Sequence, residues 1–148
     1  MMDGCLIDTS VLVRLANPHE RLHSQAVEAV RQLQQRHLMP YLTPQIVAEF
    51  WNVATRPVAA NGLGWSIEDV ARYVFTLLEN IDLLSDTAQS FYVWLYLVIT
   101  RDVQGKQVHD ARLVATMLTH GVHSLLTFNG DDFRRYADFI TIIDAGTP

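Results

Sequence analysis

The chain has 148 residues, of which 49% are hydrophobic and 18% charged, and its net charge is −5. This composition is typical of a globular protein, and the length suits one domain over residues 1–148. The longest apolar run, residues 91–99, is too short for a bilayer span of about 20 residues, so we expect no membrane segment. No secretory leader is visible at the N-terminus. Cys5 is the single cysteine, which excludes an intrachain disulfide, and we therefore expect a cytoplasmic location.

Predicted strands and helices alternate along the whole chain, judged by apolar periodicity and by helix start and stop signals. In order, we expect a strand at 4–7, helices at 9–16 and 19–37, a strand at 39–42, a helix at 43–55, a loop at 57–65, a helix at 66–80, a strand at 81–84, helices at 87–100 and 108–120, a strand at 124–128, a short helix within 129–136 and a strand at 139–143. The helix at 87–100 is so apolar that we expect it to be largely buried, although residues 91–99 could serve as a dimer surface instead of the core.

Such alternation predicts an α/β fold in which right-handed crossovers build a parallel sheet with helices on both faces. In sheets of this kind, ligand sites lie at the carboxyl ends of the strands. Asp8 and Asn129 each follow the end of a predicted strand. The sequence therefore points to this edge of the sheet as the functional one.

Glu49 is the most informative acidic residue by itself. Its neighbours Ile46, Val47, Phe50 and Val53 are apolar, which predicts a half-buried carboxylate. A buried carboxylate without a partner is costly, and a bound cation removes that cost. The alternative is an exposed glutamate or an ion pair with Arg56.

Three other acids have simple structural explanations when each is taken alone. Asp8 suits a helix N-cap, Asp110 a first-turn acid that favours the helix dipole, and Asp132 the cap of the helix that follows it. Their occurrence together with Glu49 favours a site for Mg²⁺ or Mn²⁺, because hard oxygen ligands select these ions. Spacing alone does not distinguish a nuclease from a phosphatase.

Four segments carry a resemblance to a known family: LIDTSVLV at 6–13, VAEFWNVATRP at 47–57, VHDARLVATM at 108–117 and LLTFNGDDFRRY at 125–136. Together they resemble the PIN-domain family, specifically VapC-like toxins of toxin–antitoxin pairs. The resemblance implies a three-layer α/β/α sandwich with a central parallel sheet. It also implies a metal-dependent endoribonuclease whose Mg²⁺ or Mn²⁺ ligands include Asp8, Glu49 and Asp110, with an antitoxin partner and a homodimer.

The fourth segment departs from the family pattern, because Asn129 stands where many PIN domains have an aspartate. An amide oxygen can coordinate a cation but brings no charge, and Asp132 can replace or supplement it. We therefore expect Asn129 and Asp132 to complete the site. Whether the protein holds one metal ion or two before RNA binds stays open. Thr9, Ser10 and Thr127 lie where the family often has hydroxyls near the metal, although capping and turn hydrogen bonds explain them equally well.

Basic residues near these segments are candidates for RNA contact. Arg56, Arg112, Arg134 and Arg135 suit phosphate binding, because guanidinium groups bind phosphate bidentately. For each, a solvated surface charge is the simpler alternative. Trp65 is a candidate for base stacking or for packing, and His109 is expected to point away from Asp110.

Two other functions remain open. A haloacid-dehalogenase-like phosphatase also places an aspartate after its first strand, but Ser10 occupies the position of its second aspartate. A catalytically weak module that binds RNA or a partner without cutting is the alternative from a different class. Metal titration alongside a cleavage assay separates this alternative from a nuclease.

Overall fold

The computed structural model describes residues 3–146, and five parallel strands form its single sheet. The strands are β1 (Asp3–Ile7), β2 (Leu38–Leu42), β3 (Asp82–Leu83), β4 (Ser124–Thr127) and β5 (Thr141–Asp144). Their order across the sheet is β3-β2-β1-β4-β5. The predicted parallel sheet is confirmed.

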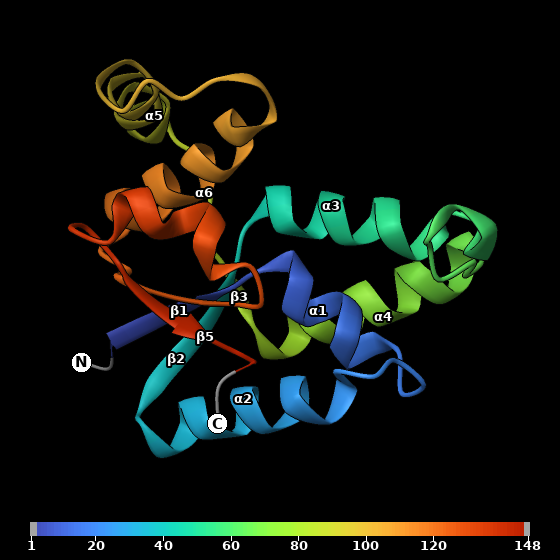
Figure 1. Cartoon of the computed structure of the whole chain (residues 1–148). Coiled ribbons are helices and arrows are strands. Elements are labelled where there is room, and N and C mark those ends of the chain that lie inside the picture. Colours follow the sequence, from blue (N-terminus) through green and yellow to red (C-terminus); the bar gives the residue numbers. More distant parts are fainter. Residues whose placement is uncertain (1–2, 147–148) are drawn as a thin grey trace.

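Among residues 3–146, six α-helices and three short 3₁₀ helices surround the sheet. They are α1 (Thr9–Ala16), α2 (His23–Gln35), α3 (Pro44–Thr55), η1 (Val58–Ala60), α4 (Ile67–Asn80), α5 (Ala88–Thr100), η2 (Gly105–Gln107), α6 (Val108–Thr119) and η3 (Gly130–Tyr136). Figure 1 shows α2 on one side of the sheet and α6 on the other. The molecule is the expected three-layer α/β/α sandwich.

Helices cover both faces of the central strands, and the apolar residues of these strands are therefore buried. Leu6 and Ile7 of β1 and Leu125 and Leu126 of β4 are almost completely buried. The start of α3 is also encoded locally: the Thr43 hydroxyl accepts a hydrogen bond from the Ile46 amide, and proline opens the first turn. These features fix the sheet centre and the helix that carries Glu49.

Two element boundaries differ from the prediction. Helix α2 begins at His23 rather than at residue 19, because the Glu20 carboxylate accepts from the Leu22 amide at 2.6 Å and holds a turn ahead of the helix. Strand β5 begins at Thr141 rather than at residue 139. The amides of Phe139 and Ile140 both bond the Tyr136 carbonyl, so they close the preceding turn instead of joining the sheet.

The prediction that the helix at 87–100 is largely buried was wrong. Only Ser90 and Leu97 of α5 are buried, and α5 packs against α6 on the side away from the sheet (Figure 1). Its outward face exposes five large apolar side chains: Phe91, Tyr92, Leu95, Tyr96 and Ile99. The apolar sequence of this helix did not reveal that α5 packs mainly against one helix, α6. Across residues 3–146, no helix combines the length and apolarity needed to cross a bilayer.

Candidate active site

The order of strands in the sheet reverses beside β1. From β1 the chain builds β2 and β3 on one side, and it then returns to place β4 and β5 on the other. Crossover connections therefore diverge at the carboxyl ends of β1 and β4, which opens a crevice there. Asp8 follows β1 directly, and Thr127 ends β4 two residues before Asn129. Because β1 and β4 are paired neighbours, these residues share one edge of the sheet.

A cavity of about 330 Å³ occupies this crevice, and it collects all five predicted metal ligands. They come from five separate places in the chain: Asp8 after β1, Glu49 in α3, Asp110 in the first turn of α6, Asn129 after β4 and Asp132 in η3. Thr9 and Ser10 of α1 also line it. The fold thus brings the predicted residues together, although this proximity leaves their roles as ligands to be tested.

Asp8 is buried, and two hydroxyls hold its carboxylate in place. Ser10 Oγ and Thr127 Oγ1 both donate to Oδ2, at 2.8 Å and 2.7 Å. The side chain makes no capping bond to α1, although Asp8 occupies the N-cap position. The capping explanation for this aspartate therefore fails. The two hydroxyls orient the carboxylate toward the cavity.

Both hydroxyls also bind the backbone that follows β4. The Phe128 amide donates to Ser10 Oγ at 3.1 Å, and the Asn129 amide donates to Thr127 Oγ1 at 2.9 Å. Each hydroxyl thus accepts from the loop while it donates to Asp8. This network joins the ends of β1 and β4 into one rigid edge.

Glu49 is half-buried and accepts a hydrogen bond from Thr9 Oγ1 at 3.0 Å. Burial raises the pKa of its carboxyl above the usual range, and the negative charge of Asp8 adds to this effect. No ion pair with Arg56 forms within residues 3–146, so the simple alternative for Glu49 does not apply. Glu49 instead faces other carboxylates.

Asp110 is the most perturbed acid in the cavity. Burial, and after it the negative charges of Asp8, Asp132 and Glu49, together raise the pKa of its carboxyl to about 7. No donor within residues 3–146 bonds the carboxylate of Asp110 or Asp132. A half-buried acid without a donor and among like charges is poorly solvated, and such acids are common at functional sites.

The donors in the cavity fit a hard divalent cation, because all of them are carboxylate or amide oxygens. The raised pKa values of Glu49 and Asp110 reflect burial first and the neighbouring carboxylates second, and a bound cation would favour the charged form of both groups. As placed within residues 3–146, no three acidic, imidazole or thiol side chains are close enough to form a ready metal site. Like-charged carboxylates separate when no cation lies between them, so closer approach is expected only with an ion bound.

The predicted RNA-contacting arginines lie outside this cavity. Arg112 pairs with Asp86 at 2.8 Å, and Arg134 pairs with Asp131 one helical turn away. Arg56 bonds the Asn61 carbonyl at 3.5 Å. Arg134 does line an adjoining cavity that shares Asn129 and Asp132 with the acidic one.

Arg14 is the residue that sequence reasoning missed. It lines the acidic cavity, and no other Lys or Arg within the described range does so. Its Nη1 donates to the Ser10 carbonyl at 2.8 Å, and its guanidinium lies 4.6 Å from the centre of the Phe128 ring. Its position four residues after Ser10 on α1 was the available signal, because residues at this spacing share a helix face.

Two other candidates are placed away from the acids. Trp65 packs edge-on against Phe50 and Tyr73, with ring centres 6.3 Å and 5.5 Å apart, so its role is packing. His109 is exposed and does not line the acidic cavity. Its carbonyl accepts from Gln45 Nε2 at 2.8 Å, which ties α3 to the start of α6.

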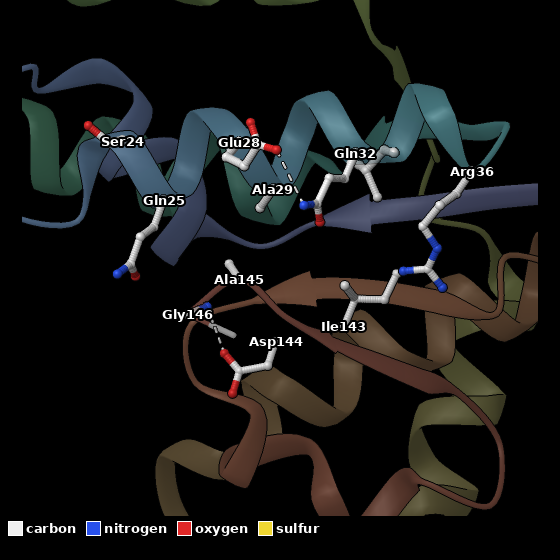
Figure 2. Close-up of a pocket in the computed structure, with 11 residues that line it drawn as sticks. Ser24, Gln25, Glu28, Ala29, Gln32, Arg36, Ile143, Asp144, Ala145 and Gly146 are labelled. Atoms are coloured by element: carbon white, nitrogen blue, oxygen red, sulfur yellow. Dashed lines mark hydrogen bonds between the residues drawn. The ribbon is translucent and has the colours of Figure 1, made fainter. Parts of the chain in front are cut away.

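A separate cavity of about 500 Å³ lies between α2 and the end of β5 (Figure 2). Its charged lining residues are Glu28, Arg36 and Asp144, and Gln32 Nε2 donates to Glu28 Oε1 at 3.4 Å. None of the predicted site residues reaches it. The chemistry expected from the sequence therefore belongs to the acidic cavity.

A family model described as PIN domain matches residues 5–139. No curated protein sequence matches this chain. Solved structures do match across nearly the full length, at sequence identities that show a shared fold. A chain of VapBC2 from Rickettsia felis, bound to a promoter DNA fragment, has a TM-score of 0.68 at 13% identity, covering 95% of this chain and 97% of that one.

Two further structures are similar to a comparable degree. A chain of VapBC-1 from nontypeable Haemophilus influenzae has a TM-score of 0.68 at 16% identity, with 97% and 98% of the two chains covered. VapC20 of Mycobacterium tuberculosis, described as a toxin that cleaves the sarcin–ricin loop, has a TM-score of 0.65 at 21% identity, with 93% and 97% covered.

Proposed function

This chain belongs to the PIN domain family, and on that premise we propose that it is a metal-dependent endoribonuclease and the toxin of a toxin–antitoxin pair. The observation that carries the proposal is the cavity at the ends of β1 and β4, where four carboxylates and one amide converge. Similarity in fold to VapC20, a toxin described as cleaving RNA, supports it. Since RNA is the substrate, we propose the cytoplasm as the place of action.

In this proposal Asp8, Glu49 and Asp110 hold Mg²⁺ or Mn²⁺, and Asn129 and Asp132 complete the site. A bound cation supplies two things, a lower pKa for the attacking water and stabilisation of the charge that builds on the phosphate. The protein supplies orientation. Both hydroxyl bonds to Asp8 go to Oδ2, and the Thr9 bond to Glu49 goes to Oε1, so each carboxylate keeps a second oxygen for a cation.

Arg14 is proposed to contact the phosphate of the bound RNA. Its Nη1 is held by the Ser10 carbonyl, and the group stacks on Phe128, so the guanidinium is positioned before substrate arrives. A cation beside the acids also offsets repulsion between the cavity and the negative RNA backbone. Arg56, Arg112 and Arg134 remain candidates for contacts further along the strand.

The test combines metal titration with RNA cleavage. We expect Mn²⁺ to bind by calorimetry, EDTA to abolish cleavage, and Asp8→Asn to reduce cleavage by at least about 100-fold. Asp3→Asn is the matched control, because it removes the same charge from an exposed side chain at the amino end of β1, which is the end of the strand opposite the acidic cavity. Binding of Mn²⁺ with varied RNA left intact would instead favour the catalytically weak binding module.

The proposed antitoxin is a small protein whose tail enters the acidic cavity. The VapBC structures that share this fold support a partner of this kind. A lining of four carboxylates favours a basic side chain on the incoming tail. Co-expression with the product of the adjacent gene should yield a stable complex that no longer cleaves RNA, and a neighbour that neither binds nor inhibits would argue against this partner.

We also propose a homodimer formed through the outward face of α5, with Tyr92, Leu95, Tyr96 and Ile99 as its contacts and without Phe91, which lines a pocket against α6. The four contact side chains range from 38% exposure at Leu95 to 67% at Ile99, and α5 contains no charged residue. A two-fold interface requires a surface that complements itself, and an uncharged apolar face meets this condition. Tyr96→Glu should convert the dimer to a monomer by light scattering, whereas Phe75→Glu on α4, also at an exposed aromatic, should not.

A further inference from the structure

A second pocket of about 390 Å³ lies between the first turns of α5 and α6. Its floor is formed by Phe91 and Trp94 of α5, and its rim carries Asp86, His109 and Arg112. This volume lies within the range of about 300–1,000 Å³ that is usual for small-molecule sites. None of the residues of the acidic cavity lines it, so it is a separate site.

The aromatic floor combines an exposed ring, Phe91, with a half-buried ring, Trp94, that a hydrogen bond fixes in place. The rings of Phe91 and Trp94 lie 5.9 Å apart with their planes tilted by 34°, and 53% of Phe91 is exposed. Trp94 Nε1 donates to the Val108 carbonyl at 2.8 Å, which fixes the indole against α6. Exposed aromatic faces held in this way stack on nucleobases in proteins that bind single strands.

The rim provides hydrogen-bonding groups of both kinds at the edge of that floor. Arg112 Nη2 donates to Asp86 Oδ2 at 2.8 Å, and the two side chains are 47% and 41% exposed. Free N–H groups of the guanidinium and the second carboxylate oxygen remain for a ligand. A base edge presents donors and acceptors side by side, whereas an apolar peptide side chain would leave this rim unmatched.

The pocket and the acidic cavity lie on either side of one helical turn. His109 and Arg112 are three residues apart and share a face of α6, whereas Asp110 projects from the opposite side into the acidic cavity. The bond from Gln45 to the His109 carbonyl holds this turn against α3, which carries Glu49. A strand that crosses the start of α6 can therefore reach both sites.

We propose that this pocket binds an unstacked nucleobase of the RNA whose phosphodiester lies in the acidic cavity. Phe91 and Trp94 stack on the base, and Asp86 and Arg112 contact its edge. The proposal rests on the proposed ribonuclease function and adds to it a second contact, which selects the nucleotide near the cleaved bond. Single-stranded or looped RNA is the substrate class that this requires, because a paired base cannot enter the pocket.

The test measures cleavage by the full-length protein with Mn²⁺, using a single-stranded oligoribonucleotide and copies that carry one abasic nucleotide at successive positions. Phe91→Ala should raise KM about tenfold with kcat little changed, since one lost base–aromatic stack weakens binding by roughly this factor. Phe91→Trp should restore the wild-type KM. Phe75→Ala is the control, because Phe75 is an exposed phenylalanine on α4 that lines no part of this pocket.

The abasic series separates base contact from a general structural effect. One abasic position should raise KM more for the wild type than for Phe91→Ala, because that variant has already lost one of the contacts to the base. If Phe91→Ala and Phe75→Ala have the same KM, the pocket proposal is overturned while the ribonuclease proposal stands. A wild type that leaves RNA uncut overturns both. If Phe91→Ala has a lower molecular mass in solution than the wild type while its KM is unchanged, the pocket serves self-association instead of RNA binding.

Discussion

Replacing Asp110 with asparagine is expected to stabilise the metal-free protein at pH 8. Burial and the neighbouring acids raise the pKa of this carboxyl from 3.8 to about 7. Below pH 3.8 the group is protonated in both the folded and the unfolded chain, and it costs nothing. As pH rises toward 7, the unfolded chain has lost a proton that the folded protein still holds, so stability falls, and above pH 7 the full cost is present.

The size of the effect follows from the shift. A pKa difference of about three units corresponds to roughly 4 kcal/mol, and solvent screening of this half-exposed group reduces it to about 1–2 kcal/mol. Asp110→Asn should therefore raise the melting temperature of the metal-free protein by about 3–6 °C at pH 8 and by little at pH 4.5. Mn²⁺ should stabilise the wild type much more than the variant.

The assay is thermal unfolding by circular dichroism at both pH values, in EDTA and then in Mn²⁺. Asp131→Asn is the control for a changed surface charge, and it should leave the melting temperature almost unchanged. If Asp110→Asn lowers the melting temperature at pH 8 in EDTA, the carboxylate stabilises the fold and our account of unbalanced charge in the cavity is wrong.

Three further predictions concern groups around the cavity and the sheet. Thr127→Val should lower the free energy of unfolding by about 1–3 kcal/mol in denaturant titrations, because Asp8 loses its 2.7 Å bond, and an unchanged midpoint would contradict this. Arg14→Ala should raise KM for RNA about tenfold, whereas Arg21→Ala, on the exposed surface, should not. If the two variants have the same KM, Arg14 does not contact the RNA. Burial raises the pKa of the Cys5 thiol to about 12, so a thiol reagent should modify it only after unfolding, and rapid labelling of the native protein would show that β1 opens.

Several features of the site were readable from local sequence. Apolar runs that end in a polar residue placed Asp8 and Asn129 at the carboxyl edge of the sheet, and the Thr43-Pro44 pair correctly placed the start of α3. Glu49 stood out because it interrupts an apolar helix face. These inferences succeeded because strand ends, caps and helix faces depend on neighbours a few residues away.

Other features depended on residues far apart in the chain. The bond from Thr127 to Asp8 spans 119 residues, and it decides that Asp8 is oriented by hydroxyls rather than used as a cap. The spacing of Ser10 and Arg14 places both on one face of α1, but only the packing of α1 over the end of β4 places that face beside the acids. The pocket between α5 and α6 likewise exists only after the two helices pack together.

The sequence by itself determined the alternation of strands and helices, the parallel sheet and the identity of the acids, because each rests on local periodicity and residue chemistry. Only the tertiary structure decided which side chains share the cavity, how burial and three neighbouring carboxylates raise the pKa of Asp110, and which face of α5 stays exposed. Burial and electrostatic repulsion depend on every neighbour in space, and those neighbours are set by the order of strands across the sheet.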